Sequence, residues 1–264
     1  MIIPDLVRLL ESDSARASLA CGRICDDHAR EAKLIQGSLL PANGFRHESV
    51  EIACRFLPFS DVGGDFADFF RLPDGVIGIY LGDVVGKGLP AAMYSALVTG
   101  TLRGIHKTGT DTAWVLELLN QRLAQRPIPG RFCSTLYALF NPASRELTFA
   151  NAGMPLPLLV SGGSCRPLGE GGLPSGMFPG ATYGRHVVRL EAGDAVLFAS
   201  DGLHESHNGN AVEFCTAKMI EVLAECGNKS AVESMDFIFE SLREFSQGSA
   251  PHDDITALML KVRD

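Results

Sequence analysis

Residues 76–98 read VIGIYLGDVVGKGLPAAMYSALV. The stretch begins with an apolar run, Val76–Leu81, whose length and composition are typical of a buried β-strand. A glycine-rich turn follows, and Ala91–Arg103 is then small and apolar on all sides, which predicts a helix buried in the interior. Asp83 stands where the strand meets the turn. The stretch therefore predicts a core of strands and helices with a carboxylate at the end of a strand.

Short apolar runs separated by glycine and proline predict further strands along the chain after residue 44. Helices are expected in pairs between groups of strands, which is typical of an α+β fold with two sheets and helices packed outside. The other expected strands are Val50–Phe56, Ser134–Phe140, Leu147–Asn151, Leu156–Val160, His186–Leu190, Ala195–Ser200 and Ile255–Val262. The other expected helices are Asp111–Ala124, with Asp111 as N-cap, Val212–Cys226 and Ser230–Phe245. The segment 161–183, rich in glycine and proline, is expected to be a mobile loop.

The bulk composition is that of an ordinary globular protein, with 264 residues of which 46% are hydrophobic and 20% charged. A formal net charge of −8 without clusters of Lys and Arg argues against a nucleic-acid-binding surface. The seven cysteines are odd in number and widely scattered, so we expect reduced thiols and no zinc site. Neither a signal peptide nor an apolar run of about 18 residues is evident. These features predict a cytoplasmic protein that binds neither nucleic acid nor membrane.

The N-terminal segment, residues 1–44, is expected to be a helical regulatory or dimerisation segment in front of a domain at 45–264. Its helix is expected over 5–40, ending before a proline and an Asn-Gly turn. Positions 25, 29, 32, 36 and 39 form a short seam with heptad-like spacing, which Gln36 interrupts. Two interpretations stay open: the helix pairs with that of a second chain, or it is an amphipathic helix lying on its own domain.

Four aspartates share one local pattern, in which an apolar strand meets a glycine or polar turn. They are Asp65, Asp83, Asp201 and Asp253. If the strands bring these residues to one edge of the core, their carboxylates would supply the oxygen ligands that Mg²⁺ and Mn²⁺ prefer. The alternative is ordinary turn chemistry, because aspartate is common at the ends of strands.

Two other catalytic patterns are excluded. A phosphate-binding P-loop needs four residues between its glycines and a hydroxyl after its lysine. Here three residues separate Gly82 from Gly86, and Gly88 follows Lys87. The chain also has no G-x-S-x-G motif that would mark a serine nucleophile.

Six motifs follow one another along the chain: DVGGDFADFF, GDVVGKGLPAAMYSALV, FANAGMPLPLLV, LPSGMFPGATY, VLFASDGLHES and PHDDITALML. Together, and in this order, they resemble the SpoIIE/RsbU-type protein serine/threonine phosphatases of the metal-dependent PPM (type 2C-like) family. The resemblance covers about residues 45–263, and IQGSLLPANG is similar to the junction that precedes the catalytic domain in this group. It implies a PPM-type αββα sandwich, that is, two antiparallel β-sheets flanked by helices, with the helical segment in front.

The resemblance also implies a site with two Mn²⁺ or Mg²⁺ ions. On the family pattern Asp83 bridges both ions, and the carbonyl of Val84 ligates one of them. Asp201 and Asp253 would hold the second ion, and Asp65 would contact metal directly or through water. The residues expected to surround these ligands are Asp254, Gly64 and Gly86.

The implied activity is hydrolysis of phosphoserine or phosphothreonine by a metal-activated water, without a covalent nucleophile. The implied substrate is a partner protein, namely a STAS-domain anti-anti-sigma factor, and an upstream sensor or separate regulator would control the enzyme. Two positions depart from related patterns: Val85 replaces the proton-donating His of eukaryotic members, and Met154 replaces the His of the common NAGH motif. Lys87 is expected to be a solvated loop lysine, with contact to the substrate phosphate as the alternative. The alternative for the whole chain is a non-catalytic PPM-like binding module.

Overall fold

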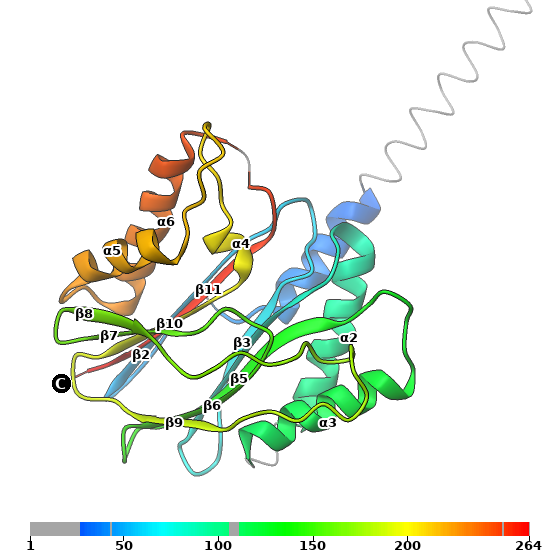
Figure 1. The fold of residues 1–264 in the computed structure, drawn as a ribbon, viewed down its shortest axis with the longest axis horizontal. Helices are drawn as coiled ribbons and strands as arrows, with labels where there is room; N and C mark the ends of the chain where they lie inside the picture. The colour runs from blue at the N-terminus through cyan, green and yellow to red at the C-terminus, as the bar shows by residue number, and fades with distance from the viewer. Residues whose placement is uncertain (1–26, 43, 106–110, 250, 264) are drawn as a thin grey trace, which may run out of the picture.

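Two antiparallel sheets lie face to face in the computed structural model, which describes residues 27–42, 44–105, 111–249 and 251–263 (Figure 1). The first sheet contains, in spatial order, β1 (Gly44–His47), β2 (Val50–Leu57), β11 (Ile255–Val262), β10 (Ala195–Ala199), β7 (Leu158–Ser161) and β8 (Ser164–Pro167). The second sheet contains β3 (Phe66–Arg71), β4 (Ile77–Val84), β5 (Cys133–Asn141), β6 (Glu146–Ala152) and β9 (His186–Arg189).

Helices cover the outer face of each sheet and complete the αββα sandwich expected from the sequence (Figure 1). The helices α2 (Gly88–Ile105) and α3 (Thr112–Gln125) pack on the second sheet, and α5 (Thr216–Cys226) and α6 (Ala231–Ser246) on the first. A short helix, α4 (Asp201–His204), follows β10, and a further helix at 27–39 lies beside α2. Within the described ranges, no helix combines the length and apolar character that a membrane crossing requires.

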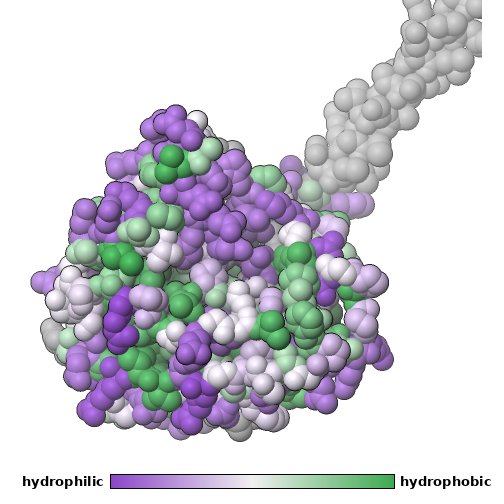
Figure 2. Space-filling view, viewed as in Figure 1, coloured by the Kyte–Doolittle hydropathy of each residue, from purple (hydrophilic) through white to green (hydrophobic). Residues whose placement is uncertain are grey.

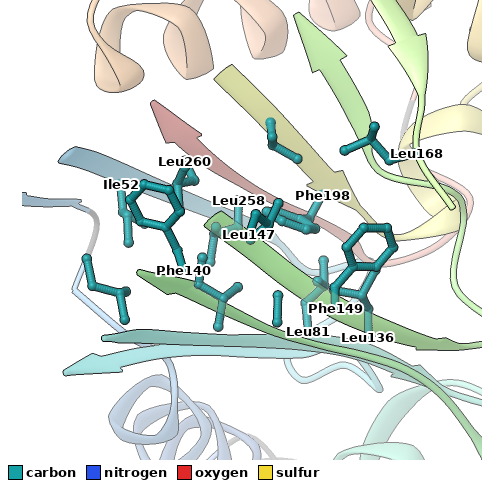
Figure 3. Close-up of a cluster of buried hydrophobic side chains, with 14 of the residues drawn as sticks. Ile52, Leu81, Leu136, Phe140, Leu147, Phe149, Leu168, Phe198, Leu258 and Leu260 are labelled. Atoms are coloured by element: carbon teal, nitrogen blue, oxygen red, sulfur yellow. The ribbon is translucent and has the colours of Figure 1, made fainter. Parts of the chain in front are cut away.

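The central strand β11 shows why its sequence is apolar at nearly every position. Leu258 and Leu260 point into the core between the two sheets, where they meet side chains from both (Figure 3). Ala257 and Met259 point to the opposite face, where α5 and α6 cover them. Successive side chains of a strand alternate between its two faces. A strand that is covered on both faces therefore favours apolar residues at nearly every position. Burying one large apolar side chain contributes about 1.5–3 kcal/mol, so β11 stabilises the packing on both faces of its sheet.

The structure corrects several expected boundaries. The strand expected to end at Leu81 continues to Val84, so Asp83 lies within β4 and not in the turn after it. The helix expected from Val212 begins at Thr216. Of the N-terminal helix expected over 5–40, residues 27–39 are helical, and the part before residue 27 lies outside the described residues.

Three strands and one helix were not expected: β1, β3, β8 and α4. In β3 the polar Asp68 interrupts an aromatic run, but it accepts hydrogen bonds from Tyr80 Oη (3.1 Å) and Arg103 Nη2 (2.8 Å), so the strand forms around a paired carboxylate. The strand β8 lies within the segment expected to be a mobile loop. It is four residues long, pairs with β7 at the edge of its sheet and ends in proline, which is tolerated at an edge.

Candidate metal centre

Asp65 and Asp83 come together because β3 and β4 are neighbours. The two strands pair in antiparallel register with Phe66 opposite Gly82, so the residue before Phe66 and the residue after Gly82 lie at the same end of the sheet. Asp65 is only 2% exposed, and Asp83 is partly buried. The sequence places these carboxylates 18 positions apart, and the register of the hairpin makes them neighbours.

Asp201 and Asp253 come together in the same way in the other sheet. The strands β10 and β11 pair in antiparallel register with Ala199 opposite Ala257. Asp201 is the first residue of α4 and lies two positions after the end of β10, and Asp253 lies two positions before β11. The two chain segments pack so closely here that a Cβ added to Gly202 would lie 2.0 Å from the carbonyl oxygen of Asp254. Each sheet therefore contributes one pair of carboxylates.

The two pairs are close enough to act on each other electrostatically. Burial, followed by the negative charge of Asp201, raises the pKa of Asp83 to about 7, and Asp253 adds to the shift. Burial and the charge of Asp83 raise the pKa of Asp65 well above its usual range. Burial and the charge of Asp253 raise the pKa of Asp201. Neighbouring carboxylates that resist ionisation in this way are stabilised by a cation placed among them.

One oxygen of these carboxylates is buried without a partner. Among the described residues, Asp65 Oδ2 has no hydrogen-bond partner. Gly64 has no side chain to cover the neighbouring oxygens. An added Cβ would lie 2.8 Å from the carbonyl oxygen of Val84 and 3.3 Å from Asp83 Oδ1. A carbonyl oxygen and carboxylates of this kind fit a hard divalent cation such as Mg²⁺ or Mn²⁺.

The coordination of a cation here would need more than side chains. Among the described residues, no group of three or more Asp, Glu, His or Cys side chains is arranged to hold a metal ion. Mg²⁺ usually keeps several waters and takes only one or two carboxylates, so the carbonyl of Val84 and water would complete its shell. The surface around α4, at this end of the sandwich, is mainly hydrophilic (Figure 2).

Asp254 has a different environment from its neighbour Asp253. It is 3% exposed, and its two oxygens accept hydrogen bonds from the backbone N–H groups of Phe59 (2.8 Å) and Gly64 (2.6 Å). A Cβ on Gly63 would lie 2.2 Å from Asp254 Oδ2, so this contact requires glycine. Asp254 therefore ties the loop that carries Asp65 to the start of β11.

Two basic side chains border the centre. Lys87 is an exposed loop lysine, as expected, and its Nζ also lies 3.0 Å from Asp253 Oδ2. Arg131 donates a hydrogen bond to the carbonyl of Val85 (2.5 Å) and crosses Gly86. Gly86 has a φ of +98°, and an added Cβ would lie 2.4 Å from the Arg131 guanidinium, so the turn after β4 requires glycine there.

Gln36 is a contact residue that the sequence analysis did not assign to the site. It is 8% exposed; its Nε2 donates to the carbonyl of Gly63 (2.7 Å), and its Oε1 accepts from the N–H of the same residue (3.0 Å). The described positions of the seam, Ala29, Ala32, Gln36 and Leu39, are the ones that this helix buries or half-buries. The polar residue that interrupts the seam was the available signal, because a buried amide must be paired.

Replacing Gln36 with alanine is expected to lower the free energy of unfolding by about 2–4 kcal/mol, because the buried N–H and C=O of Gly63 would each lose a partner. Urea denaturation of the full chain measures the change. Ser38→Ala is the matched control, since Ser38 is exposed and its hydroxyl donates to the carbonyl of Ile35 within the same helix. Equal stabilities of the two variants would contradict the docking role of Gln36.

Comparison with known proteins gives consistent results. The family model for stage II sporulation protein E (SpoIIE) matches residues 73–263. The phosphoserine phosphatase RsbU of Bacillus subtilis is 29% identical over 231 residues, which cover 86% of this chain and 68% of RsbU. Among solved structures, the RsbU and RsbW domains of a Mycobacterium tuberculosis protein match with a TM-score of 0.70 and 28% identity, over 81% of this chain and 60% of that one. The SiaA-PP2C domain of Pseudomonas aeruginosa shares the fold, with a TM-score of 0.80 and 20% identity over 92% of this chain and 98% of the domain.

Proposed function

The chain belongs to the SpoIIE/RsbU-type PPM family of phosphatases, and on this premise we propose that it is a metal-dependent protein serine/threonine phosphatase. The observation that carries the proposal is the meeting of two carboxylate pairs, one from each sheet, at one end of the sandwich. A structural role alone does not account for three neighbouring acids, Asp65, Asp83 and Asp201, whose pKa values are raised by burial and then by the negative charge of nearby carboxylates.

We assign the ligands as follows. Asp83 interacts with Asp65 in its own sheet, and the charges of Asp201 and Asp253 in the other sheet raise its pKa. This supports Asp83 as a ligand shared by two cations. Asp65 and the carbonyl of Val84 would complete one site, and Asp201 and Asp253 the other. Two Mg²⁺ or Mn²⁺ ions bound in this way would supply an activated water and neutralise the phosphoryl oxygens of the substrate.

The contribution of the protein is then to fix the carboxylates. Asp83 is held on β4 opposite Ser134, and Asp254 fixes the loop of Asp65 through two backbone hydrogen bonds. Val85 cannot donate a proton, so the leaving oxygen of serine or threonine would take its proton from water or from a group of the substrate. Displacing a catalytic group by about 1 Å can lower the rate roughly a hundredfold, so the contacts that hold these carboxylates in place matter for activity.

For the partner, we propose a phosphorylated STAS-domain anti-anti-sigma factor, and we propose residues 1–44 as a regulatory or dimerisation segment of the domain at 45–264. The likeness to RsbU supports the first, and the contact of Gln36 with Gly63 supports a link between the segment and the centre. Leu34 and Ile35 are 71% and 58% exposed on the outer side of the helix, where a second copy could bind. Light scattering of the full chain tests the dimer, and a monomeric mass would contradict it.

The test of the activity uses the full chain with p-nitrophenyl phosphate and with a phosphoserine-containing STAS protein. We expect phosphate release in Mn²⁺ or Mg²⁺, and loss of at least about a hundredfold in rate when EDTA removes the cation. Restored activity on adding excess Mn²⁺ would show that the chain remained folded. Absence of turnover on both substrates by folded, metal-bound protein would favour the alternative of a non-catalytic binding module.

A further inference from the structure

Lys87 occupies the junction of three loops around the carboxylates. Its ammonium group lies 3.0 Å from Asp253 Oδ2, donates a hydrogen bond to the carbonyl of His252 and lies 4.8 Å from the centre of the Phe59 ring. Lys87 itself belongs to the turn between β4 and α2, four positions after Asp83. One side chain thus connects the turn after β4, the loop before β11 and the loop after β2.

This ammonium group also supplies positive charge next to the four carboxylates. In the part of the chain that the structure describes, the ion pairs of Asp65, Asp83, Asp201 and Asp253 are limited to the one between Lys87 and Asp253. The charge of Lys87 also opposes the rise in the pKa of Asp201. A single positive charge therefore offsets part of the repulsion among the carboxylates.

Lys87 occupies the space beside Oδ2 of Asp253, where a metal ion bound to that oxygen would lie. A carboxylate oxygen coordinates Mg²⁺ at about 2.0–2.1 Å, and an ammonium 3.0 Å from the same oxygen would lie next to the dication. Lys87 is 44% exposed and Asp253 37%, and ion pairs with this exposure are weak and easily broken. A divalent cation that coordinates Oδ2 of Asp253 must therefore displace the ammonium, which is held weakly enough to leave.

We propose that Lys87 is a resident counter-cation of Asp253, which holds the ligand loops together without metal and competes with the divalent cation for this carboxylate. The inference rests on the proposed function, because it takes Asp253 as a metal ligand. Lys87 acts here as a positioning residue and has no contact with the reacting atoms.

The test is a calorimetric titration of the full chain with Mn²⁺, comparing the wild type with Lys87→Met and Lys87→Arg. Methionine keeps the length of the side chain but removes its charge, so Lys87→Met is expected to bind Mn²⁺ about three- to tenfold more tightly at the site that includes Asp253. Lys87→Arg keeps the charge and is expected to bind as the wild type does. Thermal unfolding of metal-free protein gives a second readout, in which Lys87→Met is expected to melt at a lower temperature.

Lys218→Met is the matched control for net charge, because Lys218 is exposed on α5 and pairs with Glu221. Its Mn²⁺ affinity is expected to equal that of the wild type. Repeating the titrations at about 0.15 M and 0.5 M salt separates contact from long-range attraction, which salt screens. Wild-type binding of Mn²⁺ with unchanged or weaker binding by Lys87→Met would overturn the inference alone. Failure of the wild type to bind Mn²⁺ would instead overturn the proposed function, and this inference with it.

Discussion

Replacing Asp201 with asparagine is expected to reduce phosphate release from a phosphoserine protein by at least about a hundredfold, with the fold intact. Asp201 opens α4 with part of its surface exposed, and asparagine has nearly the same shape. The change therefore removes a negative charge from the centre without opening a cavity. Initial rates in saturating Mn²⁺ measure the effect, and thermal unfolding of the metal-free protein checks the fold.

Glu205→Gln is the control for this prediction. Glu205 ends the same short helix, and it feels the charge of Asp201, but it is not among the proposed ligands. This variant is expected to keep most of its activity. If Asp201→Asn retained wild-type rates, or if both variants lost activity equally, the assignment of Asp201 would be wrong.

Replacing Asp254 with asparagine is expected to lower the free energy of unfolding by about 2–4 kcal/mol, because the buried N–H of Gly64 and the partly buried N–H of Phe59 share this carboxylate. Asparagine offers a single acceptor oxygen, and its NH₂ group would face either the N–H of Phe59 or that of Gly64. Urea denaturation without metal measures the loss directly.

Asp253→Asn is the matched comparison, since the two residues are adjacent in the chain. Asp253 loses one half-exposed ion pair, so its stability is expected to change by only about 0–1 kcal/mol. Its metal-dependent activity is nevertheless expected to fall further than that of Asp254→Asn. The reverse order in either measurement would contradict the separate roles given to the two carboxylates.

The strands that the sequence predicted best are those with both faces buried. Ile255–Val262 was expected and found with the same bounds, because its apolar run ends at polar residues on both sides. The strand β3 was missed because Asp68 lies in its middle, and the partner that neutralises it, Arg103, is 35 positions away. The pattern of apolar residues within a short stretch identifies strands that are apolar along their length. It does not reveal an ion pair between residues that are far apart in the sequence.

The same limit applies to the candidate centre. The pattern of strand ends identified the four aspartates, but which strands pair, and hence which acids meet, depends on sheet order. The contacts of Lys87 with Asp253 and of Gln36 with Gly63 join positions 166 and 27 residues apart. Of these two contacts, only that of Gln36 could be suspected from the sequence, because Gln36 is a polar residue within an otherwise apolar seam.

The two carboxylate pairs that meet at Asp83 are expected to bind divalent cations. Calorimetric titration of the full chain with Mn²⁺ tests it most directly, with Asp83→Asn measured beside the wild type. Two ions are expected to bind per wild-type chain, and the variant is expected to lose at least one of them. Absence of binding by the folded wild type, or the same binding by both proteins, would contradict it.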